Sequence, residues 1–243
     1  MKFSQHGFQV TTSAEPANCA VTVWFFRHGA VASHRGDVPL TEQGARDAEA
    51  AGERLATALE RGAALEFLHA PTRRARGTAE AIRRGVARAL PVDAGVDVGD
   101  PRTEQAIRNP DLYVAGIRVE MVTSIAALAE QLPPGLLTTD AVANNDFFAR
   151  FWAARDPMRV WLDDDDPPGE RRSDVARRFF AYARSLTEIV AGRARHYVCV
   201  THSGPMRAIL LEYVAQDDPG EPEYAEAIQL RFDRSGSPAW RFR

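Results

Sequence analysis

Short apolar runs alternate with amphipathic helical stretches along most of this 243-residue chain, and this alternation restricts the possible fold more than any other feature. The apolar runs are rich in β-branched and aromatic residues and indicate buried strands, whereas the intervening stretches carry apolar residues at helical spacing. The expected strands span 21–26, 65–68, 92–98 and 197–200, and the expected helices span 41–61, 72–90, 173–191 and 205–214. Strands that alternate with helices predict a three-layer α/β/α sandwich around a mostly parallel central sheet.

The alternation breaks between residues 100 and 168, where prolines, glycines and aromatic residues replace the regular pattern. We interpret this region as a helical cap inserted between core elements. Its expected parts are a loop over 100–116 and helices over 117–132 and 140–155. The aromatic residues of the last helix have helical spacing, so we expect most of them to pack the cap against the core, with one or two at the mouth of a pocket. These residues are Phe147, Phe148, Phe151 and Trp152.

The two ends of the chain complete the expected architecture. Residues 1–20 are mixed and polar and predict an N-terminal arm, whereas the runs over 228–232 and 239–242 predict a closing pair of strands. With the cap treated as an insertion, residues 1–243 are expected to form a single domain.

Charge and hydropathy exclude several classes of protein. The formal net charge of -3 gives no reason to expect a nucleic-acid partner. No stretch approaches 18 apolar residues, and the N-terminus lacks the basic-then-apolar pattern of a signal peptide. We therefore expect a cytoplasmic protein that binds neither nucleic acid nor membranes.

The acidic run from Asp163 to Asp166 does not predict a metal site. Consecutive carboxylates cannot all face one ion, and the prolines that follow indicate a solvated loop. We expect no metal and no cofactor.

Polar clusters follow the expected strands at the points where ligands bind in parallel sheets. Arg27-His28-Gly29 follows the first strand, Arg74 lies at a helix start after the second, and Thr201-His202-Ser203-Gly204 follows the last core strand. A further loop carries Glu104. Because parallel strands end at the same edge of a sheet, these clusters are expected to meet.

The residue types in these clusters suit a phosphoryl group. Arg27 and Arg74 can each bind two oxygens, and the amides of Ser203 and Gly204 at a helix start can donate to an anion. A neutral histidine such as His28 can attack phosphorus, with Gly29 leaving room for the ester.

In five segments the sequence resembles the histidine phosphatases, the phosphoglycerate-mutase-like superfamily. The Arg-His-Gly run at 27–29 is similar to the family signature. Residues 37–44 resemble the pattern D-x-P-L-T-x-x-G, and residues 70–79 resemble S-P-L-x-R-A-x-x-T-A. Residues 169–178 and 200–207 are similar to G-E-S-x-x-D-x-x-x-R and V-S-H-G-G-x-I-R. The resemblance runs in order from about residue 21 to about residue 211.

The resemblance implies a catalytic role for each matched residue. His28 would carry the phosphoryl group, Arg27 and Arg74 would clamp its oxygens, and His202 would stabilise its charge. Glu104 would be the proton donor, because the family keeps its acid in this loop. Asp97, Asp100 and Asp111 are the alternative acids.

Three positions depart from the family pattern, one of which is Arg171, where a serine is usual. His34 stands where many members have asparagine and could donate to the phosphate, and Ser203 replaces a glycine, which an amide contact tolerates. The loop after Glu104 also lacks the mutase pattern E-R-x-Y-G, which favours hydrolysis over isomerisation of a phosphoglycerate.

The resulting prediction is a phosphatase that hydrolyses a small phosphorylated metabolite through phospho-His28. The alternatives are a phosphoglycerate-type mutase and an inactive relative that binds a phosphorylated ligand. A phosphatase of phosphohistidine proteins is a further alternative, although the inserted cap favours a small, enclosed substrate. The sequence leaves open whether the chain forms a homodimer.

Overall fold

The computed structural model describes residues 19–33, 36–121, 124–188 and 193–242. The expected N-terminal arm therefore lies almost entirely outside the described residues, as does His34. No described helix is both long enough and apolar enough to cross a membrane.

The predicted mostly parallel sheet is confirmed. Its main path has the order β3-β2-β7-β1-β8-β9, and β4 pairs with β2. Strands β1, β2, β3, β4 and β7 run parallel, whereas β8 pairs antiparallel with β1 and β9 with β8. The strands are β1 (Cys19–Arg27), β2 (Ala64–His69), β3 (Asp97–Val98), β4 (Arg102–Thr103), β7 (Arg195–Thr201), β8 (Ala227–Asp233) and β9 (Pro238–Arg241). The last two are the closing pair that the sequence predicts.

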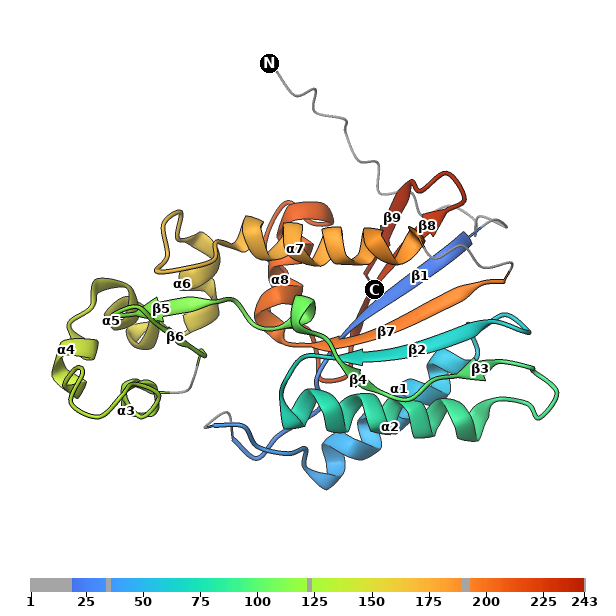
Figure 1. Ribbon diagram of the computed structural model, residues 1–243, viewed down its shortest axis with the longest axis horizontal. Coiled ribbons are helices and arrows are strands. Elements are labelled where there is room, and N and C mark those ends of the chain that lie inside the picture. Colours follow the sequence, from blue (N-terminus) through green and yellow to red (C-terminus); the bar gives the residue numbers. More distant parts are fainter. Residues whose placement is uncertain (1–18, 34–35, 122–123, 189–192, 243) are drawn as a thin grey trace, which may run out of the picture.

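Helices cover both faces of the sheet, as expected for a sandwich (Figure 1). On one face lie α1 (Glu42–Ala56) and α2 (Arg73–Ala89), and on the other lie α7 (Arg172–Ser185) and α8 (Ser203–Tyr213). Successive side chains of a strand point to opposite faces, so one buried strand supplies two cores. In β7, Val198 and Val200 join the core beneath α1 and α2, whereas Tyr197 and Cys199 join the core beneath α7 and α8.

Helices α1 and α2 pack backbone against backbone at two glycines. A Cβ atom on Gly52 would lie 2.1 Å from the carbonyl oxygen of Ile82, and one on Gly85 would lie 1.9 Å from that of Glu49. Neither contact can be relieved by a side-chain rotation, so any larger residue would separate the helices. Because Gly52 and Gly85 have no side chain, α1 and α2 can pack together in one layer.

Replacing Gly85 with alanine is therefore expected to destabilise the protein by about 1–3 kcal/mol through overpacking. Gly77, in the same helix, provides the matched control, because a Cβ there meets only the Leu40 side chain at 3.5 Å. Alanine at Gly77 should be neutral or stabilise by up to about 1 kcal/mol through helix propensity. Urea denaturation of G85A and G77A measures both, and an equal effect of the two would contradict this account.

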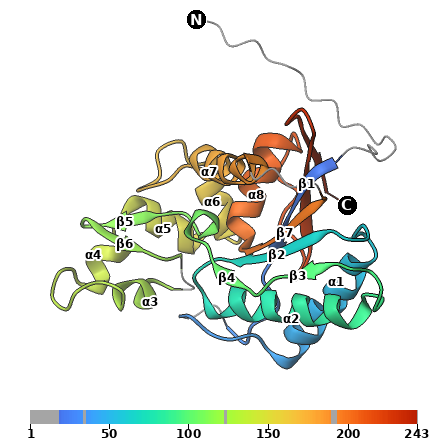
Figure 2. The ribbon, with the colours of Figure 1, turned by 45° about the vertical axis from the view of Figure 1, so that its right-hand side comes forward.

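The elements of the cap lie side by side beyond one end of the sheet (Figure 2). It contains a small antiparallel sheet as well as short helices, which corrects the expectation of a purely helical insertion. Its elements are β5 (Leu112–Val114), β6 (Ile117–Val119), α3 (Ile125–Ala129), α4 (Thr139–Ala143), α5 (Asp146–Ala153) and α6 (Pro157–Asp163).

Turn and capping residues explain where the cap predictions are wrong. The expected loop over 100–116 contains β4, a 3-10 turn (Gln105–Ile107) and β5. Ala115 and Gly116 both have positive φ, which suits a two-residue hairpin, so β6 replaces the start of the expected helix over 117–132. The expected helix over 140–155 divides into α4 and α5 because the Asn145 side chain caps a new helix.

Three core elements also differ in length from the prediction. The expected strand over 92–98 is only two residues long, and Val92 is fully exposed. Helix α7 ends at Ser185 and continues as a 3-10 turn to Glu188, and the remainder of its predicted span lies largely outside the described residues. Helix α8 begins at Ser203 instead of Pro205, so the amides of Ser203 and Gly204 belong to its first turn.

Candidate active site

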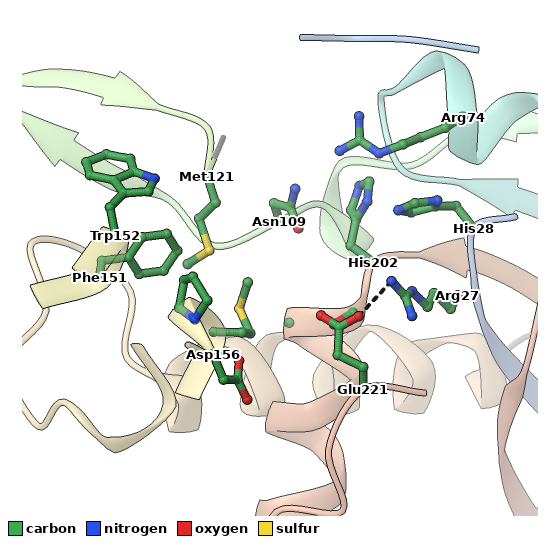
Figure 3. Close-up of a pocket in the computed structure, with 14 residues that line it drawn as sticks. Arg27, His28, Arg74, Asn109, Met121, Phe151, Trp152, Asp156, His202 and Glu221 are labelled. Carbon is green, nitrogen blue, oxygen red and sulfur yellow. Dashed lines mark hydrogen bonds and ion pairs between the residues drawn. The ribbon is translucent and has the colours of Figure 1, made fainter. Parts of the chain in front are cut away.

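Three adjacent parallel strands bring the predicted site residues together. In the pairing of β1 with β7, Arg27 lies opposite Thr201, so His28 and His202 follow at the same edge of the sheet. The backbone amide of His28 donates to the carbonyl oxygen of Thr201 at 2.9 Å. Strand β2 pairs with β7 on its other side, and the turn after it starts α2, which carries Arg74. Residues far apart in the sequence therefore face one another (Figure 3).

These side chains line a cavity of about 240 Å³ between the sheet edge and the cap. The polar residues cluster at the sheet edge, and an apolar wall lies across from them (Figure 3). The lining consists of Arg27, His28, Arg74, Asn109, Met121, Phe151, Trp152, Asp156, Pro157, Met158, His202, Ser203, Gly204 and Glu221. A cavity of this volume can hold a small molecule.

His28 is held in one tautomer. Its Nδ1 lies 2.8 Å from the carbonyl oxygen of Gly29, and a carbonyl oxygen can only accept, so Nδ1 carries the proton. In the neutral ring the lone pair then resides on Nε2, which is the form that can attack an electrophile. The ring of His202 lies 5.3 Å from that of His28, centroid to centroid, at an angle of 65°.

Arg74 presents a buried guanidinium to the same cavity. The residue is 9% exposed, and its Nε has no hydrogen-bond partner among the described residues. Burial lowers the pKa of Arg74, although the charges of Asp37 and Glu120 act in the opposite direction. The nearest ion pair, to Asp37, spans 3.9 Å. A desolvated cation with so little compensation is suited to bind an anion.

Arg27 also lines the cavity, but the loop before β8 holds much of its guanidinium. Its Nη2 pairs with Glu221 at 2.8 Å, and its Nη1 donates to the carbonyl oxygen of Pro222 at 2.5 Å. The ring of Tyr224 lies beneath the guanidinium at 4.2 Å. A guanidinium has five N–H donors, so Arg27 keeps donors for a ligand oxygen beyond these two contacts; its buried Nε has no hydrogen-bond partner among the described residues.

The start of α8 supplies the backbone part of the site. Ser203 and Gly204 form the first turn of this helix directly after His202 and line the cavity. A Cβ on Gly204 would lie 2.8 Å from the Met158 sulfur, so the cap closes tightly over this turn. A helix start of this kind favours an anion.

Gly29 has a different role from the expected one. It does not line the cavity, and a Cβ there would lie 2.8 Å from the carbonyl oxygen of Gly44. Its amide donates to the Thr78 hydroxyl at 2.8 Å. Gly29 therefore allows the loop at 27–29 to pack on the start of α1. This corrects the expectation that Gly29 makes room for an ester.

Glu104 is not brought to the cavity. Its carboxylate accepts from the amide of Ala106 at 2.9 Å and caps the 3-10 turn that follows. Burial, with a hydrogen bond and the charge of Glu104, raises the pKa of Tyr182, which lies on α7. The carboxylate of Glu104 thus faces the α7 side of the sheet, and this placement corrects the expectation that it donates the proton.

The alternative acids are also occupied elsewhere. Asp97 pairs with Arg193 at 2.8 Å, and Asp100 pairs with Arg83 at 3.0 Å. Hydrogen bonds from Arg108 and Arg118 outweigh burial and lower the pKa of Asp111 to about 2. None of the three lines the cavity.

Asn109 occupies the position beside His202 that the sequence reasoning left unassigned (Figure 3). Arg178 fixes the loop that presents it, donating to the carbonyl oxygens of Ala106 at 2.6 Å and Asn109 at 3.4 Å. The carboxylate of Glu170 pairs with Arg178 at 2.9 Å and accepts from the amide of Asp111 at 2.8 Å. The matched segment 169–178 could have identified this loop, because its glutamate and arginine are the residues that hold it.

The apolar wall comes from the cap. Met121, Phe151 and Trp152 face the polar edge across the cavity (Figure 3), and Pro157 and Met158 also line it. Phe147 and Phe148 do not line the cavity and, like Phe151, are buried in the core. The aromatic helix therefore serves both purposes that its spacing suggested.

The acidic run over 163–166 pairs with arginines. Asp163 pairs with Arg159 at 2.6 Å, Asp164 pairs with Arg150 at 2.6 Å, and Asp166 pairs with Arg171 at 3.4 Å. Within the described part of the chain, no group of three or more histidine, cysteine or acidic residues is arranged to hold a metal ion.

Comparison with known proteins agrees with this arrangement of fold and site. A sequence profile of the histidine phosphatase superfamily (branch 1) matches residues 23–97, which include the Arg27-His28-Gly29 run and Arg74. A comparison with curated protein sequences gave no significant match. The predicted resemblance to the histidine phosphatase superfamily is thus confirmed.

Solved structures share the fold at low sequence identity. A mycobacterial glucosyl-3-phosphoglycerate phosphatase is 22% identical with a TM-score of 0.55, covering 91% of this chain and 96% of that chain. Bacillus stearothermophilus YhfR is 21% identical with a TM-score of 0.53, covering 92% and 95%. A phosphoserine phosphatase mutant from Entamoeba histolytica is 13% identical with a TM-score of 0.52, covering 90% and 94%. The chain therefore has the fold of these three proteins.

Proposed function

We propose that this protein hydrolyses a phosphomonoester in two in-line steps through a phosphohistidine on His28. The observation that carries the proposal is that His28, whose Nδ1 is hydrogen-bonded to the Gly29 carbonyl oxygen, lines one cavity together with Arg74 and His202. The nucleophile and the cationic groups needed by a phosphoryl group are therefore together. The fold shared with named phosphatases agrees with this function.

The residues of the cavity have distinct roles in this mechanism. Nε2 of His28 attacks phosphorus and displaces the alcohol, and water then attacks the phosphoenzyme and releases phosphate. Arg74 and His202 stabilise the charge on the phosphoryl oxygens, with the amides of Ser203 and Gly204 and the guanidinium of Arg27 as further donors. Because these groups supply positive charge, the reaction needs no metal.

The apolar wall suggests the character of the substrate. The phosphoryl group would bind at the polar edge, which leaves the alcohol portion against Met121, Phe151 and Trp152. A small ester with an apolar or aromatic alcohol fits this surface better than a second charged group does. The substrate would then be a small phosphorylated metabolite with an apolar portion.

Release of inorganic phosphate from p-nitrophenyl phosphate, without added bisphosphate, tests the proposal. A phosphatase releases p-nitrophenol and phosphate in equal amounts at steady state, whereas a mutase would return the phosphoryl group to an added phosphoglycerate. Binding of phosphate without turnover across a panel of phosphorylated metabolites would instead identify an inactive relative.

Replacing Arg74 with methionine is expected to lower kcat/KM by roughly 100-fold, because one donor to the transferring group is lost. Arg73 is the matched control, since it precedes Arg74 in the same helix but is exposed and absent from the cavity lining. Steady-state kinetics with p-nitrophenyl phosphate and inhibition by vanadate compare the two variants. A loss in R73M as large as that in R74M would argue against a specific role for Arg74.

A further inference from the structure

The mechanism requires a proton donor for the departing alcohol. Few of the described residues near the proposed phosphate site can supply that proton. Of the residues that line the cavity, only Asp156 and Glu221 have carboxylates. Asp156 accepts two hydrogen bonds from Arg207, at 3.0 Å and 2.6 Å, and these bonds outweigh burial and lower its pKa. A carboxylate paired in this way holds its charge and is a poor acid.

Glu221 is the other carboxylate of the cavity lining, and its position is well defined. Asp37 and Glu120, whose charges act on Arg74, lie outside this lining. Its Oε2 pairs with Nη2 of Arg27 at 2.8 Å, and its Oε1 accepts from the Ser203 hydroxyl at 3.1 Å. Both partners belong to the proposed phosphate site. The side chain is 50% exposed, so it can exchange protons with solvent and admit a water molecule.

The backbone places Glu221 at the site. The loop that precedes β8 runs beside the end of β1, where the amide of Arg27 donates to the carbonyl oxygen of Glu226 at 2.9 Å. The amide of Ala225 in turn donates to the carbonyl oxygen of Arg27 at 3.2 Å. The side chain of Glu221 then lies below His202, directed toward Arg27 (Figure 3).

We propose that Glu221 is the general acid and base of the reaction, which rests on the proposed phosphatase function. In the first step Nε2 of His28 bonds to phosphorus, the ester P–O bond breaks, and the departing oxygen takes the proton of the Glu221 carboxyl group. In the second step water bonds to phosphorus, gives its proton to the Glu221 carboxylate, and the P–N bond breaks. Phosphate leaves, and His28 and Glu221 return to their starting states.

Substrate binding would prepare Glu221 for this role. In the unliganded site its carboxylate is paired with Arg27. A phosphate dianion competes with the carboxylate for the arginine and can displace it from the ion pair. The ion pair thus holds Glu221 in place until the substrate arrives.

The test is the leaving-group dependence of Glu221→Gln. An alkyl phosphate needs a proton on its departing oxygen, whereas p-nitrophenolate leaves without one. We expect E221Q to lower kcat/KM by roughly 100-fold for phenethyl phosphate and by less than about 5-fold for p-nitrophenyl phosphate. E104Q is the matched control, because Glu104 lies outside the cavity lining, and it should reduce both rates by equal, small factors.

The outcomes separate the two proposals. An equal loss of kcat/KM for both esters in E221Q would show that Glu221 only positions Arg27. A leaving-group-dependent loss seen in E104Q and not in E221Q would identify Glu104 as the proton donor. Either result overturns the assignment of Glu221 while leaving the phosphatase intact. If the wild-type protein releases phosphate from neither ester, the proposed function fails and the role of Glu221 fails with it.

Discussion

Replacing His28 with asparagine is expected to reduce kcat/KM for phosphate esters by about 10⁴-fold or more, because the reaction loses its nucleophile. Asparagine is chosen because its amide can still donate to the carbonyl oxygen of Gly29, as Nδ1 of His28 does at 2.8 Å. The substitution therefore removes Nε2 and leaves the local hydrogen bond in place. Rapid quenching of the wild-type protein should trap a phosphoenzyme that is labile in acid and stable in base, and H28N should form none.

His69 is the matched control for this experiment. It is also a buried histidine, and its Nδ1 lies 2.9 Å from the carbonyl oxygen of the next residue, Ala70. His69 does not line the cavity, so H69N should retain turnover and phosphoenzyme formation. If H28N still formed a phosphoenzyme, the nucleophile would be another residue. If H69N also formed no phosphoenzyme, the loss in both variants would be due to damage to the fold.

Replacing Arg207 with methionine is expected to lower the free energy of unfolding by about 3–5 kcal/mol, because it leaves a buried charge uncompensated. The side chains of Arg207 and Asp218 are 1% and 3% exposed, and they form an ion pair with two hydrogen bonds. Arg207 also holds Asp156, which caps the first helix turn of α6. The arginine therefore joins α8, the loop after it and the cap. Urea denaturation at pH 7 measures the loss.

The pH dependence of this loss follows from the state of Asp218. Burial alone would raise the pKa of Asp218, but the hydrogen bond and charge of Arg207 outweigh it and the pKa is lowered. A lowered folded-state pKa stabilises the protein above the unfolded value of about 4, and this contribution is lost as the pH falls through the folded value. The difference in stability between wild type and R207M should therefore shrink below about pH 4.

Two controls test the cause of the destabilisation. The double variant R207M/D218N removes the charge left behind and should recover part of the stability. Arg159 also pairs with Asp218, at 3.5 Å, but is exposed, so R159M should cost no more than about 1 kcal/mol. If R207M and R159M were equally destabilised, the buried pair would not be the cause.

Local sequence predicted the core elements well because their signals depend on near neighbours. Thr41 was expected to start a helix, and its hydroxyl accepts from the amide of Gly44. The apolar run at 197–200 lies in β7, which is buried in the centre of the sheet. In the cap, the two positive φ angles at Ala115 and Gly116 and the cap at Asn145 overrode the expected helices. There, short turn signals outweighed the helical spacing of the apolar residues.

The sequence by itself determined the α/β sandwich and the meeting of His28, Arg74 and His202, because parallel strands end at one edge wherever they lie in the chain. Only the tertiary structure decided which acidic side chain lies near these three residues. Arg178 turns the loop at 106–109 so that Asn109, and not Glu104, enters the cavity. The antiparallel return into β8 brings Glu221 to Arg27. Both placements depend on contacts between residues far apart in the sequence, and no local pattern encodes them.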